Sequence, residues 1–290
     1  MEKTEVLKRV LRILPDEQYI RLLYLAKFKK RLRLRDPKTF NEKLQWLKLH
    51  DRDPKYSHMV DKYDAKALVS KILGQEYVIP TYGVWDRFED IDFDSLPNQF
   101  VLKCTHDSGG IVICTDKAAF DREAARKVID PSMKKNYYWD YREWPYKNVK
   151  PRILAEPYLK DAKTNDLRDY KFYTFDGKVK AFLIISGRNS GETKADYFDA
   201  DLRHLDMEWG YPHSQTPPQF PEKLTEMIRL AETLSQGIKH LRVDFYEVDG
   251  QVYFGEMTFY DGGGFQPIVP ERWDEVFGAW LSLTDMMEKK

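Results

Sequence analysis

The stretch 241–258 constrains the fold of this chain more than any other part of the sequence. It reads as two strands that turn at Asp249-Gly250, a dipeptide typical of tight hairpins. Along each strand polar and apolar residues alternate, which predicts one apolar face packed against a core. The polar positions include Arg242, Asp244 and Glu256, so a single hairpin carries an arginine and two carboxylates.

Whether the two carboxylates share a face depends on the turn. A two-residue turn sends Asp244 and Glu256 to opposite faces. A three-residue loop, 248–250, pairs Glu247 with Gln251 and makes the carboxylates diagonal neighbours, roughly 7–8 Å apart at the backbone. We predict the three-residue loop, with converging carboxylates that suit Mg²⁺, an ion typically held by one or two carboxylates and substrate phosphates. The alternative interpretation is a solvated edge hairpin with scattered charges.

Charge and hydropathy exclude several classes of protein. The sequence has 47 basic and 47 acidic residues, so we expect no general affinity for nucleic acid. No apolar run approaches the roughly 20 residues of a membrane-spanning helix, and no signal peptide opens the chain. Cys104 and Cys114 lie in apolar runs and are expected to be buried thiols. We therefore expect a cytoplasmic protein.

A basic segment, 27–35, ends the second predicted helix. One interpretation is a solvated helix face. The other is contact with an anionic membrane surface, at the inner face of the membrane, or with a phosphate-bearing acceptor.

The remaining pattern alternates between helices and strands, which indicates an α+β protein. A capping box at Thr39 and Glu42 opens one helix, and Gly74 ends another. The predicted helices are 2–14, 16–34, 39–49, 61–73, 117–135, 221–237 and 271–283. The predicted strands are 77–79, 82–85, 100–104, 111–114, 152–159, the hairpin 167–186, and 195–198.

Two strands at 100–104 and 111–114 flank a glycine-rich loop. Glycines let backbone N–H groups approach phosphate oxygens, and a mobile loop suits a lid over a substrate. Lys103 lies on the strand before this loop, and Glu156 follows an apolar run in a later strand. Lys171 lies in the first arm of the hairpin 167–186, on the same face as a neighbouring aspartate.

A strand lysine, a glycine-rich flap, a strand glutamate, a charged hairpin and an Asp…Glu hairpin in this order resemble the ATP-grasp enzymes. The closest resemblance is to the TupA-like ATP-grasp family of bacterial surface-polysaccharide loci, and it covers nearly the whole chain from Phe40. The stretch from Asp169 to Arg188 is also similar to part of the ribosomal-protein glutamate ligases. The matching segments are 40–47, 61–63, 78–80, 96–97, 100–103, 153–156 and 242–246.

The resemblance implies an α+β ATP-grasp fold, in which two α+β subdomains sandwich ATP. It also implies a division of the chain into four parts. These are an N-terminal helical extension (1–60), a small α/β lead-in (61–98), a lid subdomain (99–159) and a C-terminal catalytic subdomain (160–290).

The resemblance further implies ATP and Mg²⁺ as cofactors, with a role for each matching residue. Asp244 and Glu256 are expected to hold Mg²⁺. Arg188 and Arg242 are expected to neutralise charge on the γ-phosphate or an acyl-phosphate. The residues expected to bind the nucleotide are Lys103, the lid residues His106, Ser108, Gly109 and Gly110, the hinge residues Glu156, Pro157, Tyr158 and Leu159, and Lys171.

Three positions depart from the general pattern or add to it. Pro157 stands where a second acidic hinge residue is frequent. Thr258 stands two residues after the metal glutamate, where asparagine is usual, and it offers one hydroxyl oxygen. The lid also carries His106 and Asp107, which we expect to reach an acceptor as well as phosphate.

The function implied is ATP-dependent ligation of a carboxylate to an amine through an acyl-phosphate. The expected partners are ATP, an amino acid or another amine, and a uronic-acid-containing glycan, sugar nucleotide or lipid-linked glycan. The alternative is a glycosyltransferase that uses the Asp-x-Asp spacing of Asp199 and Asp201. A sugar kinase and a nucleotide-sensing scaffold are further alternatives.

Overall fold

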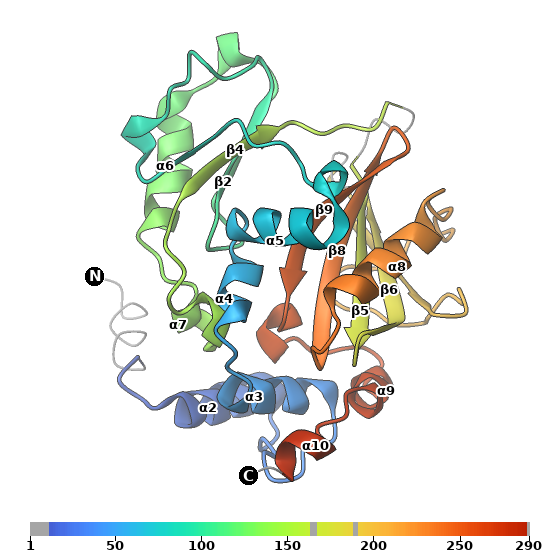
Figure 1. Cartoon of the computed structure of the whole chain (residues 1–290). Helices are drawn as coiled ribbons and strands as arrows, with labels where there is room; N and C mark the ends of the chain where they lie inside the picture. Colours follow the sequence, from blue (N-terminus) through green and yellow to red (C-terminus); the bar gives the residue numbers. More distant parts are fainter. Residues whose placement is uncertain (1–11, 163–166, 188–190, 289–290) are drawn as a thin grey trace.

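Two antiparallel sheets organise the computed structural model, which describes residues 12–162, 167–187 and 191–288 (Figure 1). The smaller sheet has the strand order β1-β4-β2-β3, and the larger has the order β7-β6-β5-β8-β9. The smaller sheet contains β1 (Gly83–Trp85), β2 (Phe100–Cys104), β3 (Ile111–Cys114) and β4 (Ile153–Pro157). The larger contains β5 (Asp169–Phe175), β6 (Lys178–Ser186), β7 (Lys194–Asp199), β8 (His240–Val248) and β9 (Gln251–Thr258).

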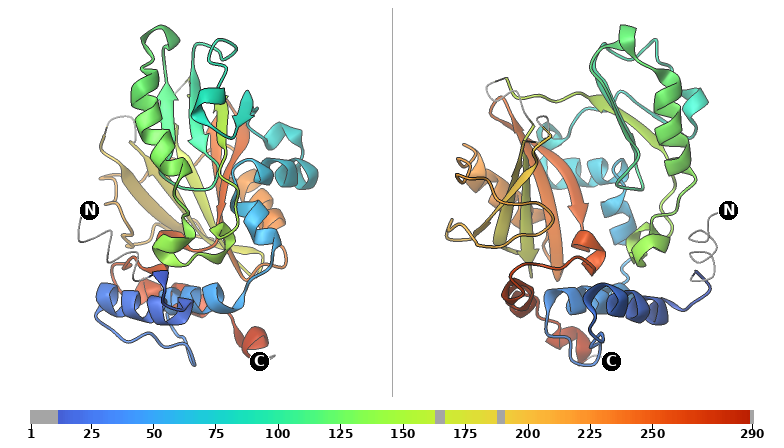
Figure 2. Two further views of the ribbon diagram at one scale, coloured as in Figure 1. Left: turned by 90° about the vertical axis from the view of Figure 1, so that its left-hand side faces the viewer. Right: turned by 180° about the vertical axis from the view of Figure 1, so that it is seen from behind.

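Helices cover the outer face of each sheet and form a base beneath them (Figures 1 and 2). The α-helices are α2 (Asp16–Phe28), α3 (Phe40–His50), α4 (Lys55–Val60), α5 (Asp64–Leu73), α6 (Arg122–Met133), α7 (Tyr138–Tyr141), α8 (Leu224–Leu234), α9 (Arg272–Trp280) and α10 (Thr284–Met287). The 3₁₀ turns are η1 (Gln75–Tyr77), η2 (Phe88–Asp90), η3 (Lys117–Ala119), η4 (Trp144–Tyr146) and η5 (Asp261–Gly264).

The larger sheet has one apolar and one polar face, because its strands alternate in sequence. On the apolar face, Phe182 stacks on Phe172 at 5.7 Å and on Phe198 at 5.2 Å between ring centroids. Helix α8 packs on this face with leucines and a methionine at helical spacing. The polar face looks toward the smaller sheet, and α4 and α5 contact the larger sheet at its β9 edge (Figures 1 and 2). The fold thus directs the charged residues of β5 and β8 into the space between the two sheets.

The base of the molecule consists of α2, α3, α9 and α10 (Figure 1). The predicted capping box of α3 is confirmed, with Thr39 and Glu42 bonding each other's backbone. Helix α2 ends at Phe28 rather than at the predicted residue 34, because Lys29 adopts a left-handed conformation (φ 56°) and its N–H bonds back to Leu25. The predicted helix 2–14 lies almost entirely outside the described residues.

The predicted helix 61–73 is also shorter than expected. Asp61 does not join α5 but accepts hydrogen bonds from the N–H groups of Tyr63 and Asp64, so the helix begins at Asp64. Cys104 and Cys114 are buried free thiols, as predicted. Within the described residues, no helix is both long enough and apolar enough to span a membrane.

Candidate active site

The hairpin of β8 and β9 places the two predicted metal ligands directly opposite each other. Its turn has two residues, Asp249 and Gly250, both with positive φ, and the predicted three-residue loop is wrong. A β-bulge restores the shared face, because Gly255 is an extra residue between the pairs Phe245–Phe254 and Asp244–Glu256. The carboxylates are therefore facing neighbours rather than diagonal ones.

Arg242 is the centre of the charged cluster on this face. Its guanidinium donates to Asp244 at 2.7 and 2.8 Å, to Glu256 at 2.7 Å and to Asp261 at 2.7 Å. Tyr173 donates its hydroxyl to Asp261 at 2.8 Å. Asp261 is an acidic residue at the start of the glycine-rich turn that follows β9, and it was not predicted as a site residue. One buried arginine thus fixes three carboxylates in a preorganised group.

Lys171 adds a second cation to the cluster. It lies opposite Asp244 in the pairing of β5 with β8 and donates a hydrogen bond to that carboxylate. Burial alone would raise the pKa of Glu256. The positive charges of Arg242, Lys171 and Lys62, which lies between α4 and α5, have the larger effect and lower that pKa to about 2. Glu256 is therefore ionised at neutral pH.

The donor set fits Mg²⁺. Asp244 and Glu256 offer hard carboxylate oxygens from adjacent strands, and Thr258 adds a hydroxyl on the same face, opposite Arg242. When bound, the ion would supply positive charge for phosphate oxygens. Arg242 and Lys171 balance the charge of these carboxylates, and both side chains line the adjoining cavity, where they can interact with phosphate.

The predicted lid loop connects β2 and β3 and is held by its own side chains. Asp107 accepts the N–H of Gly110 at 3.1 Å and a hydrogen bond from Ser132. The backbone N–H groups of Ser108 and Gly109 form no hydrogen bond within the described part of the chain. The loop therefore exposes two backbone donors suited to an anion.

His106 does not face an acceptor site as expected. Its side chain is buried, and Nε2 lies 3.1 Å from the carbonyl oxygens of Ser132 and Lys135 at the end of α6. Its imidazole anchors the base of the lid, because Nε2 donates to carbonyl groups. Asp107, by contrast, does line the cavity described below.

Lys103 and Glu156 meet in the smaller sheet, where β2 pairs with β4. Lys103 Nζ lies 2.5 Å from one oxygen of Glu156, and Lys66 Nζ from α5 lies 2.5 Å from the other. Burial would raise the pKa of Glu156, but the two lysines lower it below its usual value. Lys66 gave no signal in the sequence, because it comes from a helix that only the fold brings to β4.

The other predicted hinge residues continue from Glu156 along the chain. Pro157 pairs with Phe100 at the end of β4, and Tyr158 and Leu159 are half-buried. Arg188, predicted to be catalytic, lies outside the described residues.

A cavity of about 440 Å³ joins the lid loop to the carboxylate cluster. Its lining includes Ser108 of the loop and Arg242 and Glu256 of the cluster. A second cavity of about 430 Å³ extends from Arg242 and Glu256 over Lys171 and Tyr173. Lys62 also lines the first cavity and donates a hydrogen bond to the backbone of the lid at Asp107. Lys62 and Glu143 line this cavity from separate parts of the chain and were not predicted. Lys48 was not predicted either; its ammonium donates to the carbonyl of Gly263 in the cavity wall.

The geometry of the Asp-x-Asp segment does not favour glycosyl transfer. Asp199 accepts the N–H groups of Asp201 and Arg203 at 2.9 Å, which closes a tight turn. The Arg203 guanidinium lies 3.1 Å from Asp201. Both carboxylates are thus engaged within the turn.

Comparison with known proteins places these features in a family. The family model of the TupA-like ATPgrasp proteins matches residues 42–282. Among solved structures, D-alanine–D-alanine ligase from Bacillus anthracis complexed with ATP has 16% identity and a TM-score of 0.46, over 80% of this chain and 67% of that chain. D-alanyl-alanine synthetase A from Vibrio cholerae has 13% identity and a TM-score of 0.45, over 86% and 65%.

The chain spans about two thirds of the length of these two ligases. No curated protein matches it significantly. The family match covers most of the sequence and includes the loop between β2 and β3, the strand β4 and the Asp244–Glu256 hairpin. The chain belongs to the TupA-like ATP-grasp family and is an ATP-dependent ligase that uses ATP and Mg²⁺.

Proposed function

We propose that this ligase joins an amino acid, or another amine, to a uronic-acid-containing surface glycan or its precursor. The observation that carries the proposal is a cavity that runs from the carboxylate cluster to a groove lined by cations of α2 and the segment after it. Lys27 and Pro267 line both the cavity at Glu256 and a neighbouring one of about 640 Å³. Arg31 also lines the neighbouring cavity.

The unpaired cations at this groove support an anionic acceptor. The groove also holds four carboxylates, of which Glu42 is paired with Arg33 at 2.6 Å and Glu271 with Lys30. Four exposed cations of the segment 27–35 form no ion pair within the described part of the chain, and two of them, Lys27 and Arg31, line the groove. A polymer with repeated carboxylates would find complementary charge here while one carboxylate reaches the site. The same cations are available to an anionic membrane surface. The four unpaired cations are Lys27, Lys29, Arg31 and Arg35.

The chemistry follows from the charges at the site. A carboxylate oxygen attacks the γ-phosphorus, ADP leaves, and an amine then displaces phosphate from the acyl-phosphate to form the amide. Catalysis needs neutralisation of phosphate charge and exclusion of water. We assign charge neutralisation to Arg242 and Arg188, and magnesium binding to Asp244 and Glu256.

We assign nucleotide binding to the smaller sheet and the lid. Lys103 would bind the α- and β-phosphates once it leaves Glu156, and Lys171 would turn from Asp244 toward phosphate. The lid backbone at 106–110 would close over the phosphates, and the strand end at 156–159 would hold adenine and ribose. We propose the division 1–60, 61–98, 99–159 and 160–290 for the extension, lead-in, lid and catalytic parts.

The test is an assay of ADP and phosphate release with uronate oligosaccharides and a panel of amino acids, each added alone. Ligation predicts that release needs both substrates, and that the product mass equals their sum less one water. Glu256→Gln should lower turnover by about 100-fold or more, whereas Glu123→Gln, an exposed residue of α6, should leave it unchanged. Release of a nucleoside diphosphate from a sugar nucleotide, with no need for ATP, would refute the proposal.

A further inference from the structure

One buried carboxylate at the cavity is unpaired among the residues that the structure describes. Glu143 is 3% exposed and lines the same cavity as Glu256. Its side chain forms no hydrogen bond or ion pair within the described part of the chain. Buried carboxylates are almost always hydrogen-bonded, because leaving one unpaired is costly. Such a group, facing a cavity, indicates a ligand that supplies the missing donors.

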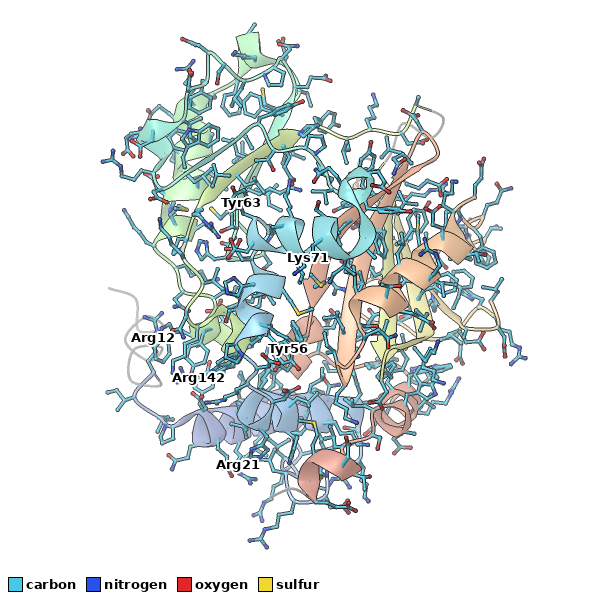
Figure 3. All side chains as sticks on the ribbon, viewed as in Figure 1. Arg12, Arg21, Tyr56, Tyr63, Lys71 and Arg142 are labelled. Carbon is cyan, nitrogen blue, oxygen red and sulfur yellow. The ribbon has the colours of Figure 1, made fainter. Side chains whose placement is uncertain are left out.

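The segment that carries Glu143 is firmly anchored. Arg142 ends α7 in a left-handed conformation (φ 56°), and its N–H donates to Tyr138 at 2.7 Å. Its guanidinium lies between α7 and α2 (Figure 3), 4.4 Å from the ring centroid of Tyr19 and 4.5 Å from that of Trp139. Pro145, in η4, is buried two residues after Glu143. This packing fixes the backbone on both sides of Glu143, so the position of the carboxylate does not depend on a ligand.

The buried cation with the largest charge effect on Glu143 does not serve as the missing partner. Lys48 is fully buried and directs its ammonium at the Gln45 side chain (3.0 Å), the carbonyl of Tyr141 (2.9 Å) and the carbonyl of Gly263. An ammonium has three N–H donors, and these three acceptors use them all. Lys48 therefore contributes charge to Glu143 from a distance but no hydrogen bond.

The pKa of Glu143 lies close to neutral pH. Burial raises the pKa of Glu143 to about 7; Lys48 and Arg242 oppose this rise, and Asp261 and Asp140 add to it. These groups come from α3, β8, η5 and α7, the elements that surround the site. A carboxyl group with this pKa can take up and release a proton at neutral pH.

The walls of the cavity beside Glu143 suit an organic cation. Aromatic rings attract cations through their faces, and a carboxylate among them completes an ammonium site. Glu256 and Arg242 line the same cavity, where the acyl-phosphate of the proposed reaction would form. The aromatic residues that line the cavity are Tyr137, Tyr141, Tyr146, Tyr260 and Phe265.

We infer that Glu143 binds the ammonium group of the amine substrate and accepts its proton before attack. This inference rests on the proposed ligation. The ammonium gives one proton to Glu143, and the freed lone pair attacks the carbonyl carbon of the acyl-phosphate. The C–N bond forms, the C–O bond to phosphate breaks, and phosphate leaves with that electron pair. The second nitrogen proton passes to water.

The experiment compares wild type with Glu143→Gln and Glu143→Asp, using the best amino acid from the screen. Glu143→Gln should raise the KM for the amine about tenfold or more, because it removes a charged hydrogen bond. It should also abolish the rise of kcat/KM between pH about 6 and 8 that deprotonation of Glu143 produces. The KM for ATP should stay within about twofold in the same assays. Glu143→Asp should recover part of the pH dependence, since it restores a carboxylate.

Hydroxylamine separates this inference from the proposed function. It is uncharged at neutral pH and traps acyl-phosphates as hydroxamates, so it needs neither an ammonium site nor a base. Glu143→Gln should form hydroxamate at the wild-type rate, which also shows that the variant is folded. Normal hydroxamate formation with an unchanged amine KM and pH profile would refute the role of Glu143 alone. Failure of the wild-type enzyme to form any hydroxamate with uronate acceptors would refute the proposed ligation. Loss of hydroxamate formation in both Glu143 variants would show a structural role and overturn the inference.

Discussion

Replacing Glu143 by glutamine should stabilise the protein, and only above a definite pH. In the folded state the pKa of this carboxyl group is raised from its ordinary value of 4.5 to about 7. At about 1.36 kcal/mol for each pKa unit, the difference between these two pKa values corresponds to about 3 kcal/mol. Since the folded pKa is the higher one, the contribution is fully present below pH 4.5 and is lost as pH rises through 7. Glutamine cannot ionise and avoids this loss.

The assay is urea-induced unfolding of wild type and Glu143→Gln at several pH values. The difference in unfolding free energy should be near zero at pH about 4 and should reach about 3 kcal/mol in favour of glutamine at pH about 8, or about 6 °C in Tm. Glu123→Gln, at an exposed position, should show no such dependence. Two results would show that the pKa of Glu143 is not raised in the folded protein. One is a Glu143→Gln variant that is less stable than wild type at high pH. The other is a difference in unfolding free energy that is the same at all pH values.

Three further variants test other parts of the structure. Gly110→Ala should lower Tm and raise the KM for ATP, because a Cβ there would lie 2.5 Å from Cys104 Sγ. Gly109→Ala should have little effect on Tm, because a Cβ there would meet open space. Equal losses of Tm in the two variants would contradict the packing of the loop. Arg242→Gln should reduce the unfolding free energy at neutral pH by about 3–5 kcal/mol, since three carboxylates lose their shared cation. Added Mg²⁺ should restore part of that loss, and no effect of the ion would argue against a metal site. Lys27→Glu should raise the KM for a uronate acceptor about tenfold without changing the KM for ATP. Lys127→Glu on α6 should change neither KM. Equal effects of the two substitutions on the acceptor KM would show that the groove at Lys27 does not bind the acceptor.

Local signals in the sequence predict most of the elements of the fold. The capping box of α3 and the hairpin turns at Asp176-Gly177 and Asp249-Gly250 depend on neighbouring residues alone, and all three are visible in the sequence. The register of β8 and β9 is different, because it depends on a bulge. Gly255 inside a strand is a known signal for a bulge. Accepting the two-residue turn and placing the bulge at Gly255 would have predicted the observed pairing.

The candidate site could be predicted only where its residues lie on one hairpin or one loop. Asp244, Glu256 and Arg242 belong to a single ribbon, so alternation brings them together. Lys48 and Glu143 lie on separate elements, and each looks like an ordinary surface charge in the sequence. Their role follows from tertiary burial, which removes solvent and leaves Glu143 without a hydrogen-bond partner among the described residues. No pattern of spacing carries that information.

The central claim is that Asp244 and Glu256 bind magnesium beneath the phosphates of ATP. The most direct measurement is calorimetric titration of a non-hydrolysable ATP analogue, with and without Mg²⁺, into wild type and Glu256→Gln. We predict that Mg²⁺ strengthens binding to wild type about tenfold or more, and that this gain disappears in the variant. The same gain in both proteins would contradict the claim, because the ion would then be held by other ligands.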